Sequence, residues 1–128
     1  MIVLDASAVL ALLLREPGAE RVTAAIVAGA RMSTVNFSEV ATRYVRAGAT
    51  EAELLALRDG LPVTLVAVDA DLALRAARMS AVTREAGLSL GDRLCLALAQ
   101  RDGATALTAD RAWAGVAGAI GVTVEVLR

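Results

Sequence analysis

Short apolar runs alternate with longer helical segments along this chain, and this alternation constrains the fold more than any other feature. Five runs have the length and composition of strands, at residues 1–4, 31–35, 63–68, 104–108 and 122–127. Helical spacing and helix-ending residues predict helices between them, at residues 7–14, 19–28, 36–47, 50–59, 71–86, 90–100 and 110–116. Strands joined through helices form a parallel sheet covered on both faces, so the sequence predicts the α/β class. A length of 128 residues suits a single domain, residues 1–128.

The first apolar run ends in an acidic residue. Asp5 directly follows Ile2-Val3-Leu4. In open α/β sheets the ligands lie outside the carboxyl ends of the strands, which is where this pattern places Asp5. Glu39, one turn into the helix after the second strand, and Asp110, directly after the fourth strand, reach the same edge by topology. Asp92 follows a helix-to-helix connection, so the topology does not force it to the same edge.

Each of these acids also has a purely structural interpretation. Asp5, Asp69 and Asp110 stand where a helix N-cap would accept backbone N–H bonds. Asn36-x-x-Glu39 and Ser89-x-x-Asp92 resemble capping boxes. Capping explains Asp69 well, but it does not require several caps to converge on one edge of a sheet. We therefore interpret four acids together as a candidate catalytic and metal-binding set: Asp5, Glu39, Asp92 and Asp110.

The composition limits the chemistry that these acids can serve. All 13 basic residues are Arg, and the chain has no Lys and no His. A Ser-His-Asp triad, a His-based ribonuclease pair, a zinc site with His ligands and a lysine Schiff base are therefore excluded. Bare carboxylates recruit hard cations such as Mg²⁺ or Mn²⁺, and clustered carboxylates stay ionised only if a cation neutralises them. A metal-bound hydroxide is then the plausible nucleophile, with a carboxylate as proton acceptor.

Four neighbours of the acids are candidates for supporting roles. Ser7 is a cap or an assisting hydrogen-bond donor at the metal site. Thr108 either orients Asp110 or packs within its strand. Arg93 and Arg111 adjoin Asp92 and Asp110, where they either meet phosphate groups or form a solvated helix face or an ion pair.

The remaining features say less about the partner. The net charge of −1 and the pI near 5.4 are not typical of a nucleic-acid-binding protein, although a basic rim of Arg is compatible with them. Trp113 and Tyr44 could stack on bases, but packing in the core or at an interface is the favoured interpretation. Cys95 lies on an apolar helix face and reads as inert core. A single cysteine forms no internal disulfide, which fits a reducing cytoplasm.

Four segments together resemble the PIN-domain ribonucleases, and most of all the VapC toxins of bacterial toxin–antitoxin pairs. The resemblance runs in order along essentially the whole chain, through residues 2–8, 38–40, 90–97 and 107–113. It implies a three-layer α/β/α sandwich on a five-stranded parallel sheet. It also implies a Mg²⁺- or Mn²⁺-dependent endoribonuclease that forms a homodimer and is inhibited by a cognate VapB-type antitoxin.

Carried over residue by residue, the resemblance gives the acids the same roles as the topology. Asp5, Glu39 and Asp92 match the core metal-binding acids of the family, and Asp110 matches a fourth, more variable acid. Ser7 and Thr108 match supporting hydroxyl positions. The substrate implied is RNA.

Two other functions stay open at this point. A catalytically inactive PIN-like module would only bind a partner, although the complete set of acids argues against it. A different metal-dependent phosphoryl-transfer domain is the second, but phosphatases and receiver domains of this kind need paired early acids or a Lys that the chain lacks. No membrane association is expected, because Ala6 to Leu14 is too short to span a bilayer and no basic segment precedes it.

Overall fold

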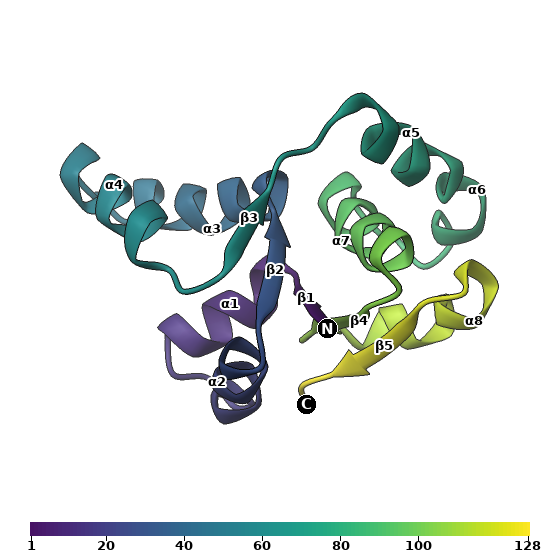
Figure 1. Cartoon of the computed structure of the whole chain (residues 1–128), viewed down its shortest axis with the longest axis horizontal. Helices are drawn as coiled ribbons and strands as arrows, with labels where there is room; N and C mark the ends of the chain where they lie inside the picture. Colours follow the sequence, from purple (N-terminus) through teal and green to yellow (C-terminus); the bar gives the residue numbers. More distant parts are fainter.

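The computed structural model describes residues 1–128 and contains one parallel sheet of five strands (Figure 1). The strands are β1 (Ile2–Leu4), β2 (Ala30–Ser33), β3 (Thr64–Val66), β4 (Thr105–Thr108) and β5 (Thr123–Val126). Their order across the sheet is β3-β2-β1-β4-β5, and every neighbouring pair is parallel. The central strand β1 is therefore the one that leads into Asp5. The predicted α/β class and five-stranded parallel sheet are confirmed.

Helices cover both faces of the sheet. They are α1 (Ala6–Leu13), α2 (Ala19–Val27), α3 (Thr34–Arg46), α4 (Glu51–Gly60), α5 (Ala70–Arg78), α6 (Ser80–Thr83), α7 (Leu90–Asp102), the 3₁₀ helix η1 (Arg111–Gly115) and α8 (Ala117–Ile120). Successive residues of a strand point to opposite faces, so Val3 packs with α5, α7 and η1 while Leu4 packs with α1, α2 and α3. These two apolar clusters, one on each side, make the sandwich a three-layer structure.

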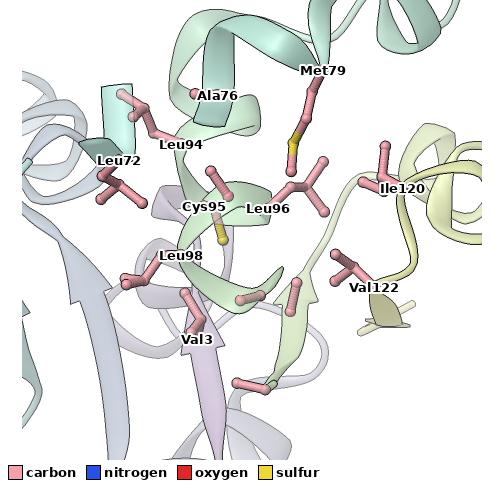
Figure 2. Close-up of a cluster of buried hydrophobic side chains, with 14 of the residues drawn as sticks. Val3, Leu72, Ala76, Met79, Leu94, Cys95, Leu96, Leu98, Ile120 and Val122 are labelled. Carbon is pink, nitrogen blue, oxygen red and sulfur yellow. The ribbon is translucent and has the colours of Figure 1, made fainter. Parts of the chain in front are cut away.

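Helix α7 is the most deeply buried helix and organises one of the two layers. Six consecutive residues, Leu94 to Ala99, are all buried. Figure 2 shows this cluster, in which Leu72 and Ala76 of α5, and Met79 directly after it, pack against α7, with Val3 of β1 below α7 in the view. Leucines alternate with small residues along this stretch of α7, and their close packing holds α7 against β1.

The long helix predicted at residues 71–86 is interrupted in the structure. Helix α5 ends at Arg78, and Ser80–Thr83 forms a separate turn, α6. The backbone tightens at Met79, whose N–H donates to Ala76 O at 3.2 Å, and the buried hydroxyl of Thr83 donates to Met79 O at 2.9 Å. The N–H of Thr83 also donates to Met79 O, at 3.1 Å, so the hydroxyl supplements the helical bond and does not replace it. The apolar spacing continues through Met79, which is why it predicted one helix.

Two other boundaries differ from the prediction. The second strand begins at Ala30 and ends at Ser33, so α3 starts at Thr34 and not at Asn36. The N-cap is Ser33, whose hydroxyl accepts from the backbone N–H of Asn36 at 3.1 Å. Near the C-terminus, the helix predicted at 110–116 is the 3₁₀ helix η1, and the turn α8 after it was not predicted.

Helices α3 and α4 extend away from the sheet as a hairpin, at the left of Figure 1. Helix α4 contains no buried residue, although a complete capping box of Thr50 and Glu53 begins it. None of the helices in the chain combines the length and the apolar character that crossing a membrane requires.

Candidate active site

Asp5 lies at the carboxyl end of the central strand and is almost completely buried, with 4% of its surface exposed. Its carboxylate caps α1 by accepting from the backbone N–H of Ala8 at 2.8 Å. Two hydroxyls also donate to it: Ser7 Oγ at 2.8 Å to Oδ1, and Thr108 Oγ1 at 2.6 Å to Oδ2. The capping interpretation of Asp5 is therefore correct. The hydrogen bonds from the Ser7 and Thr108 hydroxyls are not needed for a helix cap, however, so capping does not explain the whole environment of Asp5.

Burial raises the pKa of Asp5 from 3.8 to about 6. The hydrogen bonds from Thr108, Ala8 and Ser7 act in the opposite direction, and repulsion from Asp92 raises the pKa further. Thr108 therefore orients Asp5, in addition to its contact with Asp110, whose backbone N–H donates to Thr108 Oγ1 at 3.0 Å. Ser7 does not cap a helix, since its hydroxyl donates to Asp5 and accepts from Ala109 N at 2.9 Å.

Glu39 is positioned by Asn36, a residue that the sequence singled out only as a helix start. The Asn36 side chain is 1% exposed and donates at 3.0 Å both to Glu39 Oε1 and to Gly91 O of α7. Its own oxygen accepts from the hydroxyl of Ser33 at 2.6 Å. The predicted capping box of Asn36 and Glu39 is therefore wrong. Instead, Asn36 joins the start of α3 to the start of α7.

Gly91 allows the carboxylate of Glu39 to lie directly on α7. A Cβ atom at residue 91 would stand 2.5 Å from Glu39 Oε1 and 2.7 Å from Oε2, so only glycine fits without displacing Glu39. Glu39 is exposed to solvent, but partial burial still raises the pKa of its carboxyl, and Asp92 raises it further. A glycine in the first turn of a helical segment was the sequence signal for this close approach.

Asp92 belongs to a capping box at the start of α7, as predicted. Its Oδ2 accepts from the backbone N–H of Ser89 at 2.9 Å, while its own N–H donates to Ser89 Oγ. Cys95, one turn further along α7, is fully buried (Figure 2). Burial raises the pKa of the Cys95 thiol, and Asp5, Asp92 and Glu39 all raise it further. Glu39 lies against Gly91 in the first turn of α7, and Asp92 belongs to that turn. Asp5 lies near enough for its charge to act on Cys95 and for Asp92 to act on it.

Asp110 reaches the same edge but stands apart from the other three acids. It is exposed, and its Oδ1 caps η1 by accepting from Ala112 N at 2.9 Å. Its link to the group runs through the backbone, by the contact of its N–H with Thr108. The structure thus brings Asp5, Glu39 and Asp92 together and places Asp110 at the rim.

The arginines and aromatic residues have more specific environments than the sequence indicated. Arg93 is half-buried and donates to Ala76 O at 3.2 Å, and Arg111 donates to Arg128 O at 2.8 Å. Neither forms an ion pair, and whether either contacts substrate stays a prediction. Trp113 is completely buried and Tyr44 packs on the α1–α3 side of the core, as the favoured interpretation expected.

The charge balance at this edge fits a hard cation. None of the five ion pairs in the chain involves Asp5, Glu39, Asp92 or Asp110. The four acids offer only carboxylate oxygens as metal ligands, which suits Mg²⁺ or Mn²⁺. No three acidic side chains come close enough to hold an ion among them alone. Mg²⁺ commonly takes only one or two direct carboxylates and keeps several waters, so the residues present remain compatible with it.

Solved structures of similar fold cover nearly the whole chain. VapC20 of Mycobacterium tuberculosis has a TM-score of 0.75 at 23% identity, covering 91% of this chain and 95% of that one. VapBC2 of Rickettsia felis has a TM-score of 0.74 at 13% identity, covering 100% of both chains. FitAcB of Neisseria gonorrhoeae has a TM-score of 0.66 at 21% identity, covering 97% of this chain and 96% of that one. At these identities the likeness shows the fold.

The family follows from the sequence itself. No curated protein matches the chain. Residues 2–119, however, match the PIN domain, and this range includes β1, α3, α7 and the start of α8. The match covers far more than half of the 128 residues and agrees with the sheet order described above. This chain belongs to the PIN-domain family.

Proposed function

We propose that this protein is a metal-dependent endoribonuclease and the toxin of a toxin–antitoxin pair. One observation carries the proposal most directly: Asp5, Glu39 and Asp92 come from three separate elements, and none has a cationic partner in the chain. Glu39 lies against Gly91, next to Asp92 on α7, and the charge of Asp92 raises the pKa of both Asp5 and Glu39. Such an arrangement costs stability through repulsion and burial. That cost is typical of a functional site.

The residues have distinct roles in this proposal. Asp5, Glu39 and Asp92 would hold Mg²⁺ or Mn²⁺ with water molecules completing the coordination, because no three acids are close enough to hold the ion alone. Asp110 would contribute from the rim. The bound ion would lower the pKa of a water and stabilise the leaving oxygen of an RNA phosphodiester. Ser7 and Thr108 keep both oxygens of Asp5 in a fixed orientation, because each hydroxyl donates to that carboxylate.

A carboxylate would accept the proton from the attacking water, because the chain contains no His or Lys. Glu39 is the best candidate. Its carboxylate is partly exposed to solvent, its pKa is raised by burial and by Asp92, and a single hydrogen bond from Asn36 leaves it other lone pairs for a water. Asp5 is less suited, since buried donors already occupy both of its oxygens.

The partners are proposed from the relatives of similar fold. VapC20 is described as a sarcin–ricin loop cleaving toxin. A structure of similar fold from Klebsiella pneumoniae is a toxin–antitoxin complex, and the VapBC complexes of Rickettsia felis and Salmonella typhimurium are bound to DNA. We therefore expect a VapB-type antitoxin as the partner of this chain. A homodimer and a cytoplasmic location stay predictions from the family resemblance in the sequence.

The test is cleavage of a mixed panel of transfer, ribosomal and messenger RNA by purified protein with Mg²⁺, Mn²⁺ or EDTA. Asp5→Asn, which keeps an oxygen to cap α1, should abolish the cuts. Asp71→Asn is the matched control, because Asp71 is an exposed acid in the first turn of α5. Cuts that need metal, vanish in Asp5→Asn and persist in Asp71→Asn would support the proposal.

Cleavage that survives in Asp5→Asn would overturn the assignment of the site. No cleavage of any RNA by folded, antitoxin-free protein would favour a module that only binds a partner. Expression in bacteria gives a second readout: the wild-type chain should arrest growth and Asp5→Asn should not.

A further inference from the structure

A small polar pocket lies beside the first turn of α7. Its volume is about 280 Å³, and six residues line it: Ser80, Thr83, Arg84, Gly87, Leu88 and Arg93. Two of the six are arginines and none is acidic, and only Leu88 among them is apolar. This charge balance suits an anion.

Both arginines have donors to spare. Neither takes part in any of the five ion pairs of the chain. Arg93 uses one N–H to reach Ala76 O near the C-terminal end of α5, which anchors its side chain, and a guanidinium has five such donors. Arg84 is exposed. The purely structural role of Arg93, capping α5, therefore leaves most of its hydrogen-bonding capacity free and does not account for Arg84.

The pocket and the acids lie on opposite sides of the same helical turn. Gly91 packs against Glu39, whereas Arg93 faces the pocket and α5. Two residues along an α-helix are separated by about 200° around its axis, so these contacts face opposite directions. Asp92 lies between them, at the positive end of the α7 dipole. A strand crossing this end of α7 would meet the acids first and then the pocket.

We propose that this pocket binds a phosphate group of the RNA strand that flanks the cleaved bond. The inference rests on the proposed nuclease function. It gives this acidic chain, whose pI is near 5.4, a local basic site that can bind the RNA backbone. Guanidinium groups pair with phosphate oxygens bidentately and carry no sequence preference. The pocket therefore contributes affinity and strand direction rather than choice of target.

The first test measures binding without cleavage. A short labelled single-stranded RNA is titrated with the inactive Asp5→Asn protein across a range of salt concentrations. Adding Arg84→Gln should weaken binding and make the salt dependence less steep by about 0.7, the value for one phosphate contact on a single strand. Adding Arg43→Gln is the matched control, since Arg43 is an exposed arginine on α3 that pairs with no acid.

Equal salt slopes for Arg84→Gln and Arg43→Gln would overturn the inference, even if the wild-type chain cuts RNA. A reduced slope in Arg84→Gln alone would support it, even if the wild-type chain cuts nothing, so the two proposals fail separately. A second measurement uses orthophosphate and amide NMR. Shifts centred on residues 87–93 that disappear in Arg84→Gln would support the pocket as a phosphate site, and their absence in the wild type would overturn it.

Discussion

Asp5 combines features that oppose each other within one side chain. Burial makes its charged form unfavourable, while Ala8 N, Ser7 and Thr108 all direct donors at its carboxylate. These hydrogen bonds stabilise the ionised form. They offset only part of the effect of burial, because the pKa remains raised. The result is a carboxyl whose pKa is raised to about 6, held in one orientation for a partner charge.

This raised pKa predicts how stability depends on pH. The folded chain binds a proton at Asp5 more tightly than the unfolded chain, so the free energy of unfolding should fall as pH rises from about 4 to about 6. A shift of about two pKa units corresponds to about 3 kcal/mol. Part of it is already lost at pH 4.5, so urea unfolding in EDTA at pH 4.5 and 7.5 should show a loss of about 2 kcal/mol in the wild type and a much smaller one in Asp5→Asn. An identical loss in both proteins would contradict the assignment to Asp5.

The close contact between Gly91 and Glu39 predicts that a substitution at Gly91 lowers RNA cleavage without lowering the stability of the fold. In Gly91→Ala the new Cβ would displace the carboxylate of Glu39, the flexible end of a side chain, at little cost to the fold. Alanine in a helix also gains about 0.5–1 kcal/mol over glycine. We therefore expect unchanged or higher stability in urea, together with a fall in RNA cleavage of about 100-fold, the typical cost of misplacing a catalytic group by 1 Å.

The control for this prediction is the pair Glu39→Gln and Gly91→Ala/Glu39→Gln. If Gly91 acts through Glu39, the double variant should be no worse than Glu39→Gln alone. Additive losses would show that the two residues act independently.

At the scale of elements, the acid after the central strand and the start of α7 were predictable. Asp5 directly after β1 and the Ser89 capping box follow from short local patterns, and the structure contains both. The capping box predicted for Asn36 and Glu39 is absent, because Ser33 caps α3. The contact between Asn36 and Gly91 joins residues 55 positions apart, and no local pattern in one sequence encodes such a pair. The break after α5 was missed because the helical spacing of apolar residues continues through Met79, directly after the end of α5.

Replacing the capping residue by alanine should lower the free energy of unfolding by different amounts in the two capping boxes. Ser89 caps α7, in which Leu94 to Ala99 are all buried, so Ser89→Ala should lower the free energy of global unfolding by about 1 kcal/mol. Thr50 caps α4, which has no buried residue and projects from the body, so Thr50→Ala should fray α4 with a smaller global effect. Urea unfolding of both variants tests this, and a larger loss in Thr50→Ala would show that α4 belongs to the cooperative core.

The candidate site exists only in the whole folded molecule. Its three central acids lie at residues 5, 39 and 92, on the end of β1, on α3 and on α7. The sequence placed Asp5 and Glu39 at one edge through the parallel topology, and the packing of α7 against β1 and α5 adds Asp92. An ion that binds these acids would therefore bind the native chain and hardly bind the unfolded one, which couples metal binding to folding.

This coupling predicts that divalent metal stabilises the chain. At a Mg²⁺ or Mn²⁺ concentration 100-fold above its Kd, the free energy of unfolding should rise by about 2.7 kcal/mol, because a ligand specific to the native state shifts the equilibrium by mass action. Urea unfolding at pH 7.5 measures the gain, with NaCl of equal ionic strength as the reference. Asp92→Asn should lose most of it and Asp71→Asn should keep it. Equal stabilisation of Asp92→Asn and the wild type would place the ion elsewhere and separate the acids at this edge from metal binding.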